Sequence, residues 1–249
     1  MGDIKPTPAQ ADMGKPRVLC VYGSETGNSK RGIERHVKKW CKQEGLSFAV
    51  KEVISGNELN KRLRSGDGQA QAASLEYLAQ QCDVLLVATS SHGAGDPPSN
   101  YGEFVKLLCH EASMKSDALK GMQHAVLGFG SSTYTTFQNI PRLTDKFLGE
   151  CGSRRIARRA EIDEHDPNPG EEADWKRWGE DVFAALQALP AATAAAACEW
   201  SKPADTVDAS GLMEDDEVDT SAGRFHPMYL ACYAVIGAMF ATRYALQQQ

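Results

Sequence analysis

The pattern of apolar positions along the chain predicts five β-strands. Four of them are short apolar runs, and the run within 83–89 is uninterrupted, which is typical of a central parallel strand buried on both faces. The segment 154–162 alternates between apolar and polar positions, as a half-exposed strand does. The predicted strands lie at 17–22, 48–54, 83–89, 124–129 and 154–162.

Segments with helical periodicity separate these strands. Ile33, Val37 and Trp40 fall on one face of a predicted helix, because side chains three or four positions apart lie together on a helix surface. Residues 55–73 are polar and glycine-rich, which predicts a long loop with at most a short helix. The predicted helices lie at 28–43, 101–112, 136–151 and 171–189.

The regular alternation of strands and helices predicts an α/β fold with a doubly wound, five-stranded parallel sheet. Ligands of such sheets bind beyond the carboxyl ends of the strands, where the strand order reverses. The loops that follow the first, third, fourth and fifth strands are therefore the places to search for function.

Composition divides the chain into four parts. Residues 1–15 are polar and predict a disordered N-terminus, and residues 16–189 form the predicted α/β domain. Residues 190–225 are Ala-rich and then acidic, which predicts a disordered linker. Residues 226–249 are mainly apolar and predict a C-terminal helix.

The C-terminal helix admits two interpretations. The segment 228–246 is close to the length of one bilayer crossing, and Arg243 is able to snorkel to the interface. This favours a tail anchor on the cytosolic face of an intracellular membrane. Gly237 and three tyrosines weaken that interpretation. The alternative is a helix packed on the α/β domain or on a partner.

Cysteine usage favours a cytoplasmic protein, and the negative charge is concentrated in one stretch. The net charge is −6, and eight acids against one base lie between Glu199 and Asp219, so the remainder is close to neutral. The seven cysteines are scattered and none has CxxC spacing. This pattern suggests neither a zinc site nor a disulfide framework, and indicates a reducing compartment.

The loop after the first strand carries the clearest chemistry. Ser24, Thr26, Asn28 and Ser29 offer polar groups, and Gly27 permits a tight turn. The helix that follows offers free N–H groups at its start, so the run suits a phosphate monoester held by neutral donors. The simpler alternative is a Ser/Thr-rich helix cap.

The run from Gly23 to Asn28 resembles the FMN-phosphate loop of flavodoxins, and especially of the FMN domains of diflavin reductases such as cytochrome P450 reductase. This resemblance covers about residues 16–189 and implies a flavodoxin-like sheet with strand order 2-1-3-4-5. It also implies a phosphate-binding role for the whole first loop: Ser24, Glu25, Thr26, Gly27, Asn28 and Ser29.

The loop at 90–100 is similar to the family's flavin loop. Gly93 and Gly95 permit close backbone approach to a flat ring. His92 stands where P450 reductase-like members have an aromatic residue that covers the flavin, and a solvated histidine is the alternative interpretation. The resemblance assigns flavin contacts to Ser91, His92, Gly93, Ala94 and Gly95.

The loop at 128–137 is similar to the family's Gly-Leu-Gly-Asn/Asp-x-x-Tyr-x-x-Phe. Tyr134 corresponds to the family's tyrosine that stacks on the isoalloxazine, whereas Ser131 replaces the usual Asn or Asp. We expect Phe137 to be a core residue under the loop, although it belongs to the motif. The implied contacts are Gly128, Gly130, Ser131, Tyr134 and Phe137.

Two features accompany the fifth strand. The acidic run that follows it resembles the one after the fifth strand of diflavin reductases, which implies a flavin or partner contact for Asp163 or Glu164, between which the sequence does not choose. The strand itself carries four arginines, which predict either a basic stripe for an acidic partner or a solvated edge strand. These are Arg154, Arg155, Arg158 and Arg159.

The resemblance implies an FMN-binding electron-transfer flavoprotein. The sequence up to Gln249 is too short to include the FAD and NADP domains of the family. We therefore expect a separate NAD(P)H-dependent reductase as electron donor and a haem or other protein as electron acceptor. Two alternatives remain open: a flavodoxin-fold interaction module that has lost FMN, and an FMN-dependent quinone reductase.

Overall fold

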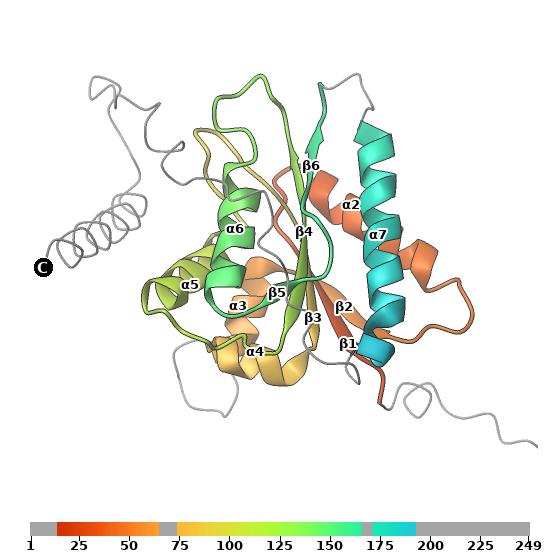
Figure 1. Ribbon diagram of the computed structural model, residues 1–249. Coiled ribbons are helices and arrows are strands. Elements are labelled where there is room, and N and C mark those ends of the chain that lie inside the picture. The colour runs from red at the N-terminus through yellow and green to blue at the C-terminus, as the bar shows by residue number, and fades with distance from the viewer. Residues whose placement is uncertain (1–13, 65–73, 166–170, 193–249) are drawn as a thin grey trace, which may run out of the picture. The chain divides into compact units, whose positions relative to one another are not determined.

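A parallel sheet forms the centre of the computed structural model, which describes residues 14–64, 74–165 and 171–192. Its strands are β1 (Arg17–Tyr22), β2 (Ala49–Ser55), β3 (Val84–Ser90), β4 (Gln123–Gly130), β5 (Arg154–Arg155) and β6 (Ala160–Asp163). The order is β2-β1-β3-β4-β5, and β6 also pairs with β4 (Figure 1). All pairings are parallel, so the predicted doubly wound order 2-1-3-4-5 is confirmed.

The fifth strand position differs from its prediction because it consists of two short strands. β5 pairs with β4 at Gln123 and His124, and β6 pairs with it from Leu127 to Gly130. Residues 125 and 126 of β4 thus lie between the two pairings, opposite the longer segment 156–159. Extra residues on one strand interrupt the ladder and bend the edge.

Helices cover both faces of the sheet. They are α2 (Asn28–Trp40), α3 (Gly56–Arg64), α4 (Leu75–Gln81), α5 (Gly102–Ser113), α6 (Asn139–Glu150) and α7 (Glu171–Ala192). α2 and α7 lie on one face, and α3, α5 and α6 lie on the other (Figure 1). The sequence missed α4 and placed the start of α6 three residues too early.

The core on the α2 and α7 face is rich in aromatic rings. Trp40 and Trp178 are almost fully buried beside the strands. Between them the imidazole of His36 stacks on Trp175, with ring centroids 3.8 Å apart. Burial lowers the pKa of His36 to about 4, so its ring is neutral at physiological pH. Gly179 of α7 leaves room for that ring, because an added Cβ would lie 2.0 Å from His36 Cε1.

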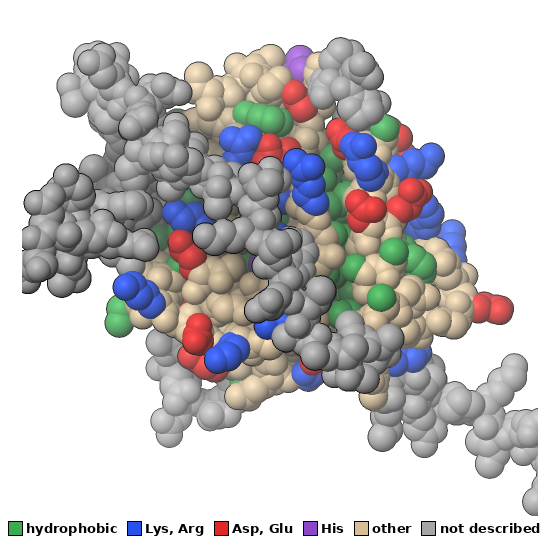
Figure 2. Space-filling model, viewed as in Figure 1, with side chains coloured by type: hydrophobic (Ala, Val, Ile, Leu, Met, Phe, Trp, Pro, Cys, Tyr) green, Lys and Arg blue, Asp and Glu red, His purple; other side chains and the backbone are tan. Residues whose placement is uncertain are grey.

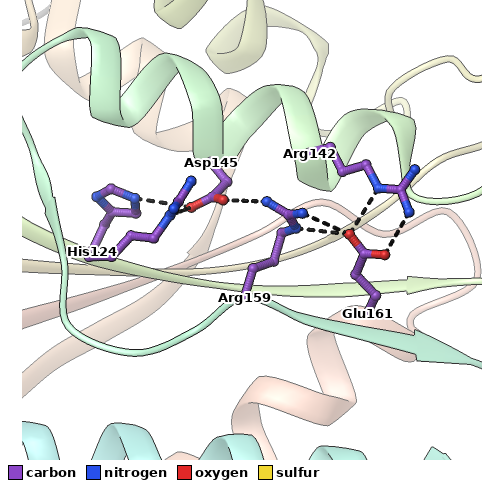
Figure 3. Close-up of polar contacts among 6 residues, drawn as sticks. His124, Arg142, Asp145, Arg159 and Glu161 are labelled. Carbon is purple, nitrogen blue, oxygen red and sulfur yellow. Dashed lines mark hydrogen bonds and ion pairs between the residues drawn. The ribbon is translucent and has the colours of Figure 1, made fainter. Parts of the chain in front are cut away.

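A network of ion pairs holds the split edge to α6 (Figure 3). Asp145 is 1% exposed and accepts hydrogen bonds from His124 Nε2 at 3.2 Å and Arg155 Nε at 2.7 Å. Arg159 joins Asp145 to Glu161, and Glu161 also accepts from Arg142 at 2.9 and 2.7 Å. The network therefore explains why this edge is rich in arginine.

Two of the four arginines of the fifth strand fit neither a basic stripe nor a solvated edge strand. Arg155 and Arg159 are two of its four arginines, and both turn toward carboxylates. On the face seen in Figure 2, Lys and Arg side chains are interspersed with Asp and Glu. Arg155 and Arg159 thus join the edge to its neighbours.

Several predictions fall on residues that the structure does not describe. They are most of the disordered N-terminus, the linker from residue 193 onward, and the apolar C-terminal helix with its proposed anchor at 228–246. Residues 190–192, predicted to begin the disordered linker, are instead the last residues of α7. Within the described ranges, no helix is long and apolar enough to cross a membrane.

Candidate functional site

Four loops meet at one edge of the sheet, because the carboxyl ends of parallel strands point the same way. They follow β1, β3, β4 and β6, and they lie at the top of Figure 1. They are the loops in which the sequence predicted the functional residues. The structure adds the hydrogen bonds that join each loop to the next.

The first loop leads into α2 through Gly27, whose φ of +87° is left-handed. The first hydrogen bond of α2 runs from Arg31 N to Gly27 O at 3.0 Å. The N–H groups of the turn before Arg31 therefore have no carbonyl within the helix. Ser29 is 1% exposed, and its Oγ has no hydrogen-bond partner among the described residues. This turn has donors available for an anion.

Asn100 joins the first loop, which follows β1, to the third loop, which follows β3. Its Oδ1 accepts from Ser24 N at 2.9 Å, and its Nδ2 donates to Ser24 O at 3.1 Å. Glu25 forms a parallel link, since its carboxylate accepts from Ser99 N at 2.8 Å. That backbone hydrogen bond lowers the pKa of Glu25. The carboxylate of Glu25 thus joins the first loop to the third.

The third loop is a tight hairpin. His92 and Asp96 exchange backbone hydrogen bonds of 2.7 Å, and the turn between them contains Gly93 and Gly95 with φ of +54° and +94°. Ala94 lies between these glycines and is exposed. The imidazole of His92 is also exposed. The hairpin therefore presents backbone at the edge where the flavin is expected.

The third and fourth loops are held together at the start of α6. Ser91 Oγ accepts from Ile140 N at 3.0 Å, and Asn139 Nδ2 donates to Gly95 O at 3.1 Å. α6 begins late because Gln138 before it has a left-handed φ of +62°. Residues 131–138 form a series of turns, and these take the place of the predicted first turn of the helix.

The fourth loop exposes one aromatic ring. Tyr134 is 64% exposed. Phe137 is half-buried against Gly130, where an added Cβ would lie 3.1 Å from its ring, so the expected core position is only partly reached. Gly128 leaves room for the buried side chain of Gln138. Tyr134 is thus the aromatic side chain of this loop that is free to stack on a ligand.

Hydrogen bonds join the fifth loop, which follows β6, to the fourth loop, which follows β4. Asp163 Oδ1 accepts from Ser132 N and His165 N, each at 3.0 Å, and the bonds to Ser132 hold its pKa below the usual range. Glu164 N donates to Gly130 O at 3.0 Å, and its carboxylate is exposed. Ser131 Oγ lies 2.9 Å from His165 Nδ1. The structure thus separates the two acids: Asp163 holds the loop, and Glu164 faces solvent.

A pocket of about 260 Å³ opens beside the first loop. Its walls come from the first turns of α2, the end of β4 and the start of α7, and Arg35 in it pairs with Glu172 at 3.1 Å. The lining residues are Asn28, Arg31, Gly32, Arg35, Phe129, Glu172 and Trp175.

Known proteins resemble a large part of this chain. The family model described as Flavodoxin matches residues 55–178. A bifunctional cytochrome P450/NADPH–P450 reductase of Bacillus cereus is 32% identical over 175 residues, which are 70% of this chain and 14% of that protein. Methionine synthase reductase of Caenorhabditis elegans is 30% identical over 168 residues, 68% of this chain and 21% of that protein.

A solved structure supports the fold. The flavodoxin of Streptococcus pneumonia TIGR4 covers 70% of this chain and 99% of its own, with a TM-score of 0.50 and 18% identity. The chain spans only 14% and 21% of the two curated relatives above. The similarity is therefore limited to a small part of those larger proteins.

Proposed function

We propose that this chain, which contains a flavodoxin-like domain related to those of diflavin reductases, binds FMN and transfers electrons. The observation that carries the proposal is the meeting of the four loops at one sheet edge. One loop has donors without a partner in the described part of the chain, and another has an exposed aromatic ring. FMN supplies one- and two-electron chemistry when bound, and the protein binds and orients it.

The residues present fit the parts of FMN. The first turn of α2 and the buried hydroxyl of Ser29 offer donors for the phosphate. Tyr134 offers an exposed ring for the face of the isoalloxazine. The hairpin of Gly93 and Gly95 offers backbone groups for the ring edge. The side chains of Ser91 and Asn100 hold these loops in place.

We further propose that the electrons come from an NAD(P)H-dependent reductase and pass to a haem or other acceptor protein. Support comes from the relatives, whose names describe a P450 reductase and a methionine synthase reductase. In this role no side chain of the site acts as acid, base or nucleophile, since the residues bind and orient the cofactor.

Purification of the full chain tests the proposal. We expect flavin absorbance from the purified protein, release of FMN on denaturation, and recovery of the absorbance when the apoprotein is mixed with FMN. A colourless protein that ignores added FMN would contradict the proposal and favour an interaction module. NAD(P)H–quinone turnover by the FMN-loaded chain alone would indicate a quinone reductase instead.

A further inference from the structure

A guanidinium folds back over the first loop from within α2. Arg31 Nη2 donates to Asn28 Oδ1. Arg31 Nη1 lies 2.9 Å from the position that a Cβ would take on Gly27. The absence of a side chain at Gly27 therefore leaves space for this cation above the loop.

This cation differs from its neighbours in having no carboxylate partner among the described residues. Lys30 lies 3.9 Å from Glu34, and Arg35 pairs with Glu172 at 3.1 Å. The first turn of α2 contains no acid either. The positive end of the helix and the guanidinium thus lie together without a negative charge between them.

Such an arrangement is unfavourable unless an anion binds there. A helix N-terminus carries partial positive charge, so a cation in the first turn is repelled by it. The nearby Ser29 Oγ is also buried without a partner among the described residues. An anion at this turn would satisfy both the hydroxyl and the excess positive charge. The pocket lined by Asn28, Arg31 and Gly32 shows that this side of the loop is open.

We propose that Arg31 is a charged donor to the FMN phosphate, held in position by Asn28, and that it sets the preference of this protein for FMN over riboflavin. The proposal rests on the FMN-binding function proposed above. It replaces the expectation that neutral donors alone hold the phosphate. Lys30 and Arg35 are already paired and have no such role.

Titration of the full-length apoprotein with FMN and with riboflavin tests this role. Flavin fluorescence reports each Kd. We expect Arg31→Gln to raise the Kd for FMN about 10- to 100-fold, as loss of a charged hydrogen bond does. The Kd for riboflavin, which lacks the phosphate, stays within about twofold of the wild-type value. The dependence of FMN binding on salt also becomes weaker, because one charge pair is lost.

Three variants provide controls. Arg35→Gln and Lys30→Gln each remove one positive charge from the same helix, and we expect each to change the Kd for FMN less than about threefold. Arg31→Lys keeps the charge but loses the fork that Asn28 orients, so its Kd for FMN falls between those of the wild type and Arg31→Gln. Unfolding midpoints of the apoproteins confirm that each variant is folded.

The outcomes separate this inference from the proposed function. If the wild type binds FMN but Arg31→Gln leaves the Kd unchanged, or weakens FMN and riboflavin equally, the role of Arg31 is wrong and the FMN site stands. The inference also fails if Arg35→Gln or Lys30→Gln has the same effect as Arg31→Gln, since general charge then explains it. If the wild type binds neither flavin, both proposals fail.

Discussion

At the scale of single residues, the candidate site combines an exposed ring, a left-handed turn and an amide that joins two loops. Tyr134 and Gly27 stand out in the sequence, and the structure gives them the exposed ring and the left-handed turn that their proposed roles require. Asn100 has no such signal. Its amide serves Ser24, and only the parallel sheet brings these two residues into contact.

Tyr134 is the residue whose replacement best tests the flavin face. Tyr134→Leu removes an aromatic stacking partner, worth about 0.5–1.5 kcal/mol, so we expect the Kd for FMN to rise about 2- to 10-fold. The unfolding midpoint of the apoprotein should not change, because the ring is 64% exposed. Fluorescence titration and thermal unfolding measure the two effects. Met114→Ala is the matched control, since Met114 is 69% exposed and follows α5; an equal loss of affinity there would contradict the stacking role.

At the scale of elements, the periodicity of apolar residues predicted the central strands and most helices, but not the divided edge. The alternation within 154–162 favours one strand. The structure instead bends this segment so that Arg155 and Arg159 reach Asp145 of α6. That contact joins residues from separate elements, and no local pattern contains it. The start of α6 was misplaced for a similar reason, because the turn before it depends on Gln138, whose side chain donates to Ile162 O of β6.

The buried network predicts a large effect of Asp145→Asn. Removing one partner of a buried ion pair leaves uncompensated charge, so we expect a loss of about 3–5 kcal/mol in the free energy of unfolding at neutral pH. Denaturant unfolding measures it. Asp83→Asn is the control, because Asp83 also pairs with an arginine but is 47% exposed, and its loss should be below about 1 kcal/mol. Equal losses would mean that burial does not determine the effect.

The same network predicts how stability depends on pH. Burial alone would raise the pKa of Asp145, but hydrogen bonds from His124 and Arg155 outweigh it and lower the pKa to about 2. Its stabilisation is therefore complete above the unfolded-state pKa of about 4, is worth about 2 kcal/mol, and is lost as the pH falls toward 2. Burial also lowers the pKa of His124, so acidification below about 6.5 favours unfolding as well. Unfolding of Asp145→Asn between pH 4 and 2 should show a weaker dependence on pH; an unchanged slope would assign the effect to other carboxylates.

Replacing each of two helical glycines by alanine is expected to change stability in opposite directions. Gly179→Ala would place a methyl group 2.0 Å from the buried ring of His36, between α7 and α2. Overpacking of this kind costs about 1–3 kcal/mol. Gly149→Ala in α6 meets nothing within 4 Å, and alanine is the better helix former by up to about 1 kcal/mol. Thermal unfolding should therefore give a lower midpoint for Gly179→Ala and a higher one for Gly149→Ala, and the same direction for both would contradict the packing of α7 on α2.

At the scale of the whole molecule, charge and packing are unevenly distributed. Residues 193–249 contain eight acids and three bases, so they carry most of the net charge of −6. The core extends from Val18 to Leu189 and draws on both ends of the described domain. The boundary that composition predicts at residue 189 therefore coincides with the last residue of this core.

A fragment of residues 14–192 tests whether that core is sufficient. Every strand of the sheet and every helix that covers it falls within this fragment, so the apolar contacts that stabilise the domain are retained. We expect the fragment to unfold in one cooperative transition at the midpoint of the full chain, and to bind FMN with a Kd within about threefold of it. A shorter fragment that ends at residue 165 is the control, since it lacks α7 and leaves the apolar side of α2 around Trp40 uncovered. It should not show a cooperative transition. A lower midpoint or weaker FMN binding for residues 14–192 would mean that residues outside them stabilise the domain.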